Sequence, residues 1–142
     1  MAILKSVRVS ALVLLIAFLC TSCAMSLPQG QAWLDAKTGS ANMDLSGNWM
    51  CQEFSMAQLN QEGRNVTGAF YSGGMIKGVV SGNTVSLLIY DAETVVYLAE
   101  LQSVDQKTIK GRYVPASNTL SNSKNWDEFA RPIGMSKMPP QK

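Results

Sequence analysis

The chain has no histidine and few cysteines. Of its 142 residues none is His and three are Cys. Histidine is the commonest general base and the commonest metal ligand. The sequence also lacks the paired cysteines of zinc sites, an Asp-rich calcium loop and a Gly-x-Ser-x-Gly nucleophile motif. We therefore expect neither an enzyme nor a protein that binds a metal or another cofactor.

The sequence also lacks an excess of either charge. It has 12 basic and 10 acidic side chains and no run of five basic residues. Two of the basic residues, Lys5 and Arg8, precede the first apolar segment, and without them the chain is balanced. Nucleic acids and anionic membrane surfaces attract clustered Lys and Arg. We therefore expect no nucleic-acid partner and no polybasic membrane contact.

Long hydrophobic runs are absent as well. The longest uncharged, largely apolar segment runs from Val9 to Leu19. A membrane-spanning helix needs ~20 residues. The segment instead has the length of the apolar region of a secretory signal peptide, with Lys5 and Arg8 as the positive region before it.

This apolar segment ends in the sequence LCTSCA, from Leu19 to Ala24. Small residues before a cysteine resemble the lipobox of bacterial lipoproteins, although Cys20 stands where Leu is usual. The resemblance implies a signal peptide over residues 1–22, cleavage before Cys23 and acylation of Cys23, with palmitate among the expected chains. It also implies anchoring in the outer membrane on the periplasmic side, because Ala24 rather than Asp follows the cysteine. Exposure on the cell surface stays open.

Cleavage would leave one cysteine without lipid. Cys20 would leave with the signal and Cys23 would carry lipid, so no intramolecular disulfide could form. Cys51 follows Trp49 at strand spacing. We expect Cys51 to be a small buried apolar residue rather than a reactive thiol.

Residues 23–44 have little periodicity and contain Pro28, Gly30 and Gly39. They predict a flexible tether between the lipidated cysteine and the folded domain. The bulky pair Trp33-Leu34 is the exception, and we expect it to dock on the domain as a short turn.

From Leu45 to Ile133 the sequence predicts a β domain, followed by a polar tail over residues 134–142. Short runs rich in Val, Ile, Leu, Tyr and Thr alternate with turn signals, which is typical of an antiparallel meander. We expect the meander of about eight strands to close into a small barrel, with a two-sheet sandwich as the alternative. The expected strands are 46–54, 56–62, 65–72, 75–81, 84–91, 94–103, 107–114 and 126–132.

Alternation along these strands assigns side chains to two faces. The opposite face also carries apolar residues, namely Val79, Leu88, Val96 and Leu98, and would pack on the Trp33 segment, a partner or a membrane. The residues expected inside are Trp49, Cys51, Ala57, Leu59, Val66, Phe70, Ile76, Val80, Val85, Leu87, Ile89, Tyr97, Leu101, Ile109 and Tyr113.

Three strands share a pattern of apolar, polar, Gly, any, apolar residues. The glycines are Gly68, Gly78 and Gly111, and alternation places each on the inner face. Glycine weakens a strand unless a bend or another backbone requires the space. We expect a close backbone approach at each of them.

Two motifs resemble the calycin group of lipocalins, fatty-acid-binding proteins and avidins. Gly47-Asn48-Trp49 is similar to the Gly-x-Trp of the group's first strand, and Arg131 lies near the end of the last expected strand. The resemblance implies an all-β barrel in which Arg131 packs over Trp49 at the closed end.

Two functions remain open for such a barrel. In the first, a calycin-like module binds a small apolar or amphipathic ligand at its mouth, near the polar loop from Pro115 to Asn125. In the second, the barrel is packed and its outer face binds another envelope protein. The expected ligand-binding residues are Glu53, Phe70, Tyr97, Tyr113 and Trp126, although a core position in the last strand is the simpler interpretation of Trp126.

Overall fold

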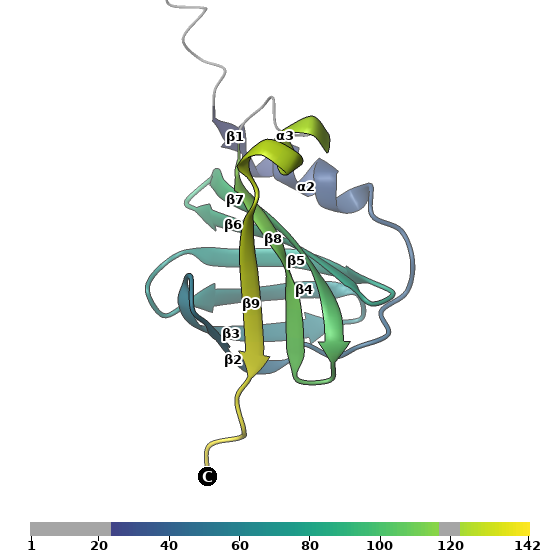
Figure 1. Ribbon diagram of the computed structural model, residues 1–142, viewed down its shortest axis with the longest axis vertical. Coiled ribbons are helices and arrows are strands. Elements are labelled where there is room, and N and C mark those ends of the chain that lie inside the picture. The colour runs from purple at the N-terminus through teal and green to yellow at the C-terminus, as the bar shows by residue number, and fades with distance from the viewer. Residues whose placement is uncertain (1–23, 117–122) are drawn as a thin grey trace, which may run out of the picture.

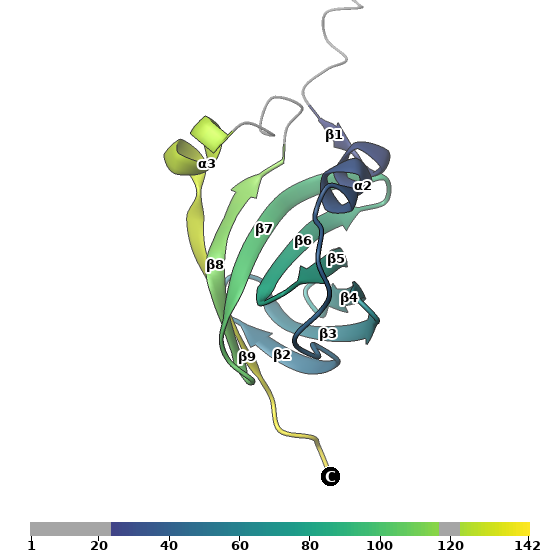
Figure 2. The ribbon, with the colours of Figure 1, turned by 90° about the vertical axis from the view of Figure 1, so that its right-hand side faces the viewer.

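The computed structural model describes residues 24–116 and 123–142, and it is dominated by β-strands (Figures 1 and 2). The expected signal peptide, Cys23 and the middle of the Pro115–Asn125 loop lie outside the described residues. The elements in chain order are β1 (Met25–Ser26), α2 (Leu27–Asp35), β2 (Gly47–Cys51), β3 (Ser55–Glu62), β4 (Asn65–Phe70), β5 (Met75–Ser81), β6 (Thr84–Asp91), β7 (Thr94–Asp105), β8 (Thr108–Pro115), α3 (Ser123–Phe129) and β9 (Arg131–Lys137).

Strands β2 to β9 form a closed antiparallel barrel. Neighbours in the chain pair with each other from β2 to β9, and β9 closes the circle on β2 through three residue pairs. The short strand β1 pairs with the start of β7, beyond the end of β8. Closure removes exposed strand edges. The barrel prediction is confirmed, and the sandwich alternative is wrong.

The last strand lies further along the chain than the sequence pattern indicated. The expected strand 126–132 is wrong, because Ser123–Phe129 forms α3 and β9 begins at Arg131. Trp126 and Ala130 are four residues apart and both pack on the outer apolar cluster, which is helical spacing. β9 then continues through Gly134 to Lys137, into the segment expected as a polar tail.

The segment expected as a tether contains two elements that pack on the barrel. Ser26 caps α2, since its hydroxyl accepts from the Gln29 N–H while the Gln29 side chain accepts from the Ser26 N–H. Leu34 is fully buried on α2, so the Trp33-Leu34 pair docks on the domain as expected, within a helix rather than a turn. A Cβ atom at Gly30 would lie 2.9 Å from methyl groups of Leu88 and Val95, so glycine lets the helix approach the sheet.

The barrel interior is filled by one apolar cluster, and the residues expected inside belong to it except Tyr97 and Tyr113, which are partly buried and pack against it. The cluster also contains residues that the alternation did not assign. These are Leu45, Ala99, Ile133 and Met135, with Ala41, Met43 and Phe54 packed against it.

A second apolar cluster covers the outer face of β5 to β8. It includes Val79, Leu88 and Leu98, which the sequence placed on the opposite face, and it packs under α2 and α3. Val96 is the exception, because it is exposed. The second apolar surface is therefore largely covered by the chain's own helices.

The three strand glycines lie where neighbouring backbones come close. A Cβ atom would lie 2.2 Å from the Gln58 carbonyl oxygen at Gly68, 2.5 Å from that of Ser86 at Gly78 and 1.9 Å from that of Glu100 at Gly111. Real Cβ atoms do not approach carbonyl oxygens this closely. The predicted close backbone approach is confirmed at all three positions.

Candidate functional site

Four aromatic side chains close one end of the barrel, which we call the aromatic end. Phe54, in the turn between β2 and β3, lies at the centre. Its ring centroid is 5.3 Å from Phe70 on β4, 5.3 Å from Tyr97 on β7 and 5.0 Å from Tyr113 on β8. Tyr97 and Tyr113 also meet edge to face at 5.4 Å. These are favourable aromatic geometries, so the four rings pack on one another.

Three of the five expected ligand-binding residues therefore lie together, and Phe54 occupies the space between them. The sequence pattern placed Phe54 at the end of a strand with its side chain outward. Ser55 adopts a positive φ of 76°, and the chain reverses at this turn instead of continuing as a strand. An alternation pattern cannot predict that a side chain in such a turn points into the barrel, so the sequence does not identify Phe54 as an interior residue.

The other two expected ligand-binding residues lie elsewhere. Glu53 is exposed in the same turn, and its carboxylate accepts a hydrogen bond from the Cys51 thiol at 3.4 Å. Burial raises the pKa of Cys51 to about 11, so this thiol is protonated at neutral pH. Trp126 lies outside the barrel on α3, where its ring stacks on Trp33 at 6.5 Å.

The stacked tryptophans join the two helices on the outer face of the barrel. Lys37 lies 4.5 Å from the Trp33 ring centroid and pairs with Glu100 on β7. Arg112 on β8 lies 6.0 Å from the Trp126 ring centroid. A cation over each ring stabilises the contact electrostatically. Trp126 therefore has a packing role between α2, α3 and the sheet.

The opposite end of the barrel, which we call the groove end, is closed around Trp49. The Trp49 indole N–H donates to the Leu45 carbonyl at 2.7 Å. The expected closure of Trp49 by Arg131 is wrong, because Arg131 begins β9 beside Tyr113, toward the aromatic end. Lys137, at the other end of β9, lies 5.7 Å from the Trp49 ring centroid instead. A cation covers the tryptophan as expected, but it comes from a lysine six positions later.

The chain before β2 completes this closure. Gln61 accepts from the Leu45 N–H at 2.8 Å and donates to the Met43 carbonyl at 2.8 Å. These bonds hold Met43 and Leu45 against the interior cluster. Both ends of the barrel are thus closed by the protein's own side chains.

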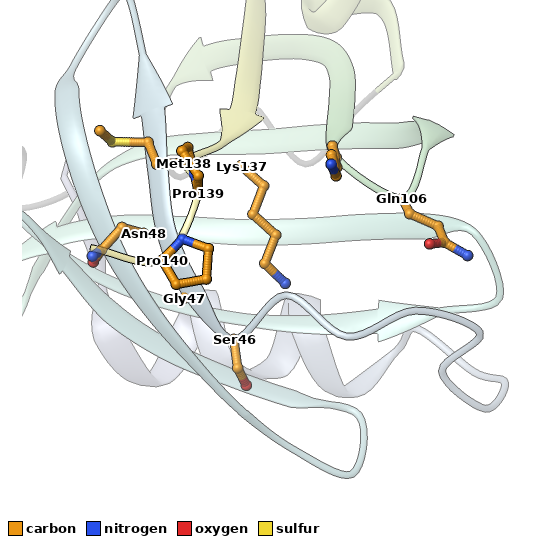
Figure 3. Close-up of a pocket in the computed structure, with 9 residues that line it drawn as sticks. Ser46, Gly47, Asn48, Gln106, Lys137, Met138, Pro139 and Pro140 are labelled. Carbon is orange, nitrogen blue, oxygen red and sulfur yellow. The ribbon is translucent and has the colours of Figure 1, made fainter. Parts of the chain in front are cut away.

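A groove of about 850 Å³ lies at the groove end, between the start of β2 and the residues after β9 (Figure 3). In Figure 3 the Lys137 side chain extends across it between Gln106 and Pro140. A second depression of about 240 Å³ is lined by Lys137 and Trp49 among other residues. The lining combines two lysines with amides and an apolar wall, namely Ser46, Gly47, Asn48, Gln106, Lys107, Lys137, Met138, Pro139 and Pro140.

The charge of Lys137 is partly satisfied within the protein. Its ammonium lies 3.4 Å from the Asp44 carbonyl oxygen. The backbone N–H of Ser46 lowers the pKa of the Asp44 carboxyl, and the Ser46 hydroxyl and the Lys137 charge act in the same direction. The Lys107 side chain is exposed, and among the described residues only its backbone takes part in hydrogen bonds. In this part of the chain, Lys107 is therefore the lysine of the groove that is better placed to meet a partner.

Five depressions in the described part of the chain have volumes between about 230 and 850 Å³. None of them is lined by Phe70, Tyr97 or Tyr113. In the same residues no three acidic or cysteine side chains cluster closely enough to hold a metal ion. No helix among them has the length and apolar character to span a membrane.

Comparison with protein families, with curated sequences and with solved structures finds no match to this chain. The structure itself defines the class of protein, a small closed barrel of eight antiparallel strands with one extra strand and minor helices. This architecture is compatible with a calycin-like barrel.

Proposed function

We propose that this chain is a lipid-anchored envelope protein whose barrel is a packed scaffold for binding another protein. The lipobox-like sequence before Cys23 supports the anchor, and Ala24 supports sorting to the outer membrane on its periplasmic side. The observation that carries the scaffold role is the packed interior. Phe54 fills the space between Phe70, Tyr97 and Tyr113, so a ligand would have to displace well-packed rings.

The groove supports the choice of binding surface. It is the largest of the five depressions, and its volume is in the range of ordinary ligand sites. The exposed Lys107 favours an acidic partner, and the apolar wall of Met138 and the two prolines favours one with apolar side chains beside its carboxylates. The proposed partner is therefore an acidic, partly apolar segment of an envelope protein.

Charge reversal in the groove tests this proposal. A photoreactive residue in place of Gln106 is used to crosslink the partner in membranes of the protein's own cells. We expect Lys107→Glu to reduce the crosslinked species by at least about tenfold, because like charges across an interface are strongly unfavourable. In the part of the chain that the structure describes, Lys107 forms hydrogen bonds only through its backbone, so the variant should fold normally.

Lys110→Glu is the matched control. Lys110 is exposed on the same hairpin, its substitution changes the net charge equally, and it does not line the groove. The crosslink should persist in this variant. An equal loss in both variants, or no loss in Lys107→Glu, would contradict binding through the groove.

A further inference from the structure

The short strand β1 fixes the point at which the lipid anchor would meet the barrel. Met25 and Ser26 pair with Val95 and Thr94 at the start of β7, and the Leu27 N–H donates to the Glu93 carbonyl at 2.8 Å. Met25 is itself buried in the outer cluster. The chain is therefore held to the barrel from its second residue after Cys23.

The remaining length of chain is very short. Two residues span at most about 7 Å even when fully extended. A lipid attached to Cys23 would hold β1 close to the membrane surface. The expected tether of residues 23–44 cannot act as a spacer, because α2 and β1 within it are packed on the barrel.

From this geometry we infer that the protein docks on the membrane with one defined end, formed by β1, α2, α3 and the β6–β7 turn, and points its groove away from the bilayer. The inference rests on the proposed acylation of Cys23. In Figures 1 and 2 these elements lie together at one end of the long axis, and the C-terminal segment that borders the groove leaves at the other.

The exposed side chains at the docking end fit a neutral lipid surface. Val96 on β7 and Phe129 on α3 are 40% and 51% exposed, although both are large and apolar. Asp91 and Glu93 are exposed in the β6–β7 turn of the same end. Carboxylates are repelled by anionic lipids. The surface on which this end docks is therefore the interface of the zwitterionic lipids around the anchor.

Two valines on one strand provide a matched test of this orientation. Val96 and Val104 are both exposed on β7, at 40% and 63%, and lie eight residues apart. This separation is about 25 Å along a strand. Each is replaced by Cys in the acylated protein and labelled with a thiol-reactive fluorophore. The remaining thiol, Cys51, is fully buried and protonated, so it labels slowly.

The labelled proteins are reconstituted in phosphatidylcholine vesicles that contain headgroup spin-labelled lipid. We expect several-fold stronger quenching at residue 96 than at residue 104. A flexible Gly/Ser insertion of about 20 residues between Ala24 and Met25, which spans about 25 Å, should abolish this difference while acylation is retained.

The possible outcomes distinguish a failure of the orientation from a failure of the lipid anchor. Equal quenching at the two positions, or stronger quenching at residue 104, in protein shown by mass to carry acyl chains would overturn the orientation alone. Protein from the same cells that carries no acyl chain on Cys23 would overturn the anchor and the orientation together.

Discussion

At the residue scale, the barrel depends on glycines that allow strands to approach closely. Gly68, Gly78 and Gly111 pair with Leu59, Leu87 and Leu101 on the adjacent strands. Each of these leucines belongs to the interior cluster. A small residue beside a large one lets neighbouring strands coil tightly while the interior stays filled.

Gly111 gives the sharpest test of this arrangement. A methyl group at residue 111 would lie 1.9 Å from the Glu100 carbonyl oxygen, and backbone cannot move aside as a flexible side chain can. We expect Gly111→Ala to lower the free energy of unfolding by about 2 kcal/mol or more, measured by urea denaturation.

Gly134→Ala is the control for a glycine that has room. The nearest atoms to a Cβ at residue 134 are 3.8 and 4.0 Å away, which is ordinary contact. The free energy of unfolding of the Gly134→Ala variant should change by no more than about 0.5 kcal/mol. Equal losses in the two variants would mean that the glycines matter for backbone flexibility and not for close approach.

Whether a side chain lies inside the barrel was predictable where the two-residue period of the strands is regular. Trp49, Val85 and Ile109 are interior as the alternation predicts. Phe54 was not predictable, because the positive φ of Ser55 reverses the chain at a point that the pattern reads as continuous strand. Lys137 was missed because its position over Trp49 depends on where β9 begins.

At the scale of elements, α2 and α3 cover an apolar outer face that a solvated barrel would not have. Leu34 on α2 and Trp126 on α3 belong to the same cluster as Leu88 and Leu98. The stacked rings of Trp33 and Trp126 connect the helices directly. The helices therefore stabilise the barrel from outside.

The docking of α2 can be tested at Gly30. A side chain there would meet Leu88 and Val95, whereas Ala32 on the same helix is exposed. We expect Gly30→Leu to lower the free energy of unfolding by about 2 kcal/mol, and Ala32→Leu to change it by less than about 0.5 kcal/mol. Hydrogen exchange of the α2 amides should quicken only in Gly30→Leu. Unchanged exchange in that variant would contradict close packing of α2.

The elements themselves were predictable in part. Turn signals located β3 to β8 to within a few residues, since tight hairpins require Gly, Asn and Asp at set positions. The sequence predicts a strand where α3 forms, because Trp126 and Phe129 are typical strand residues and seven residues are too few for a clear helical period. Tertiary contact with the outer cluster decides its conformation.

At the scale of the molecule, the long axis separates two ends with different proposed roles. β1 and the helices lie at one end, and the groove with Lys107 and Lys137 lies at the other. All-β architecture followed from strand spacing, but barrel closure depends on the three pairs between β2 and β9, which are distant in sequence. The groove was not predictable from the sequence, because it forms between the first and the last segments of the domain, which are distant in sequence and adjacent in space.

The native mass of the protein purified from the membranes of its own cells tests the lipid anchor and the packed barrel together. We expect a chain that begins at Cys23, carries acyl groups and retains no small molecule, because the barrel is packed. A chain that begins at Met1, or that lacks acyl groups, would contradict the anchor. A stoichiometric small ligand that dissociates on unfolding would contradict the packed scaffold and favour the ligand-binding barrel.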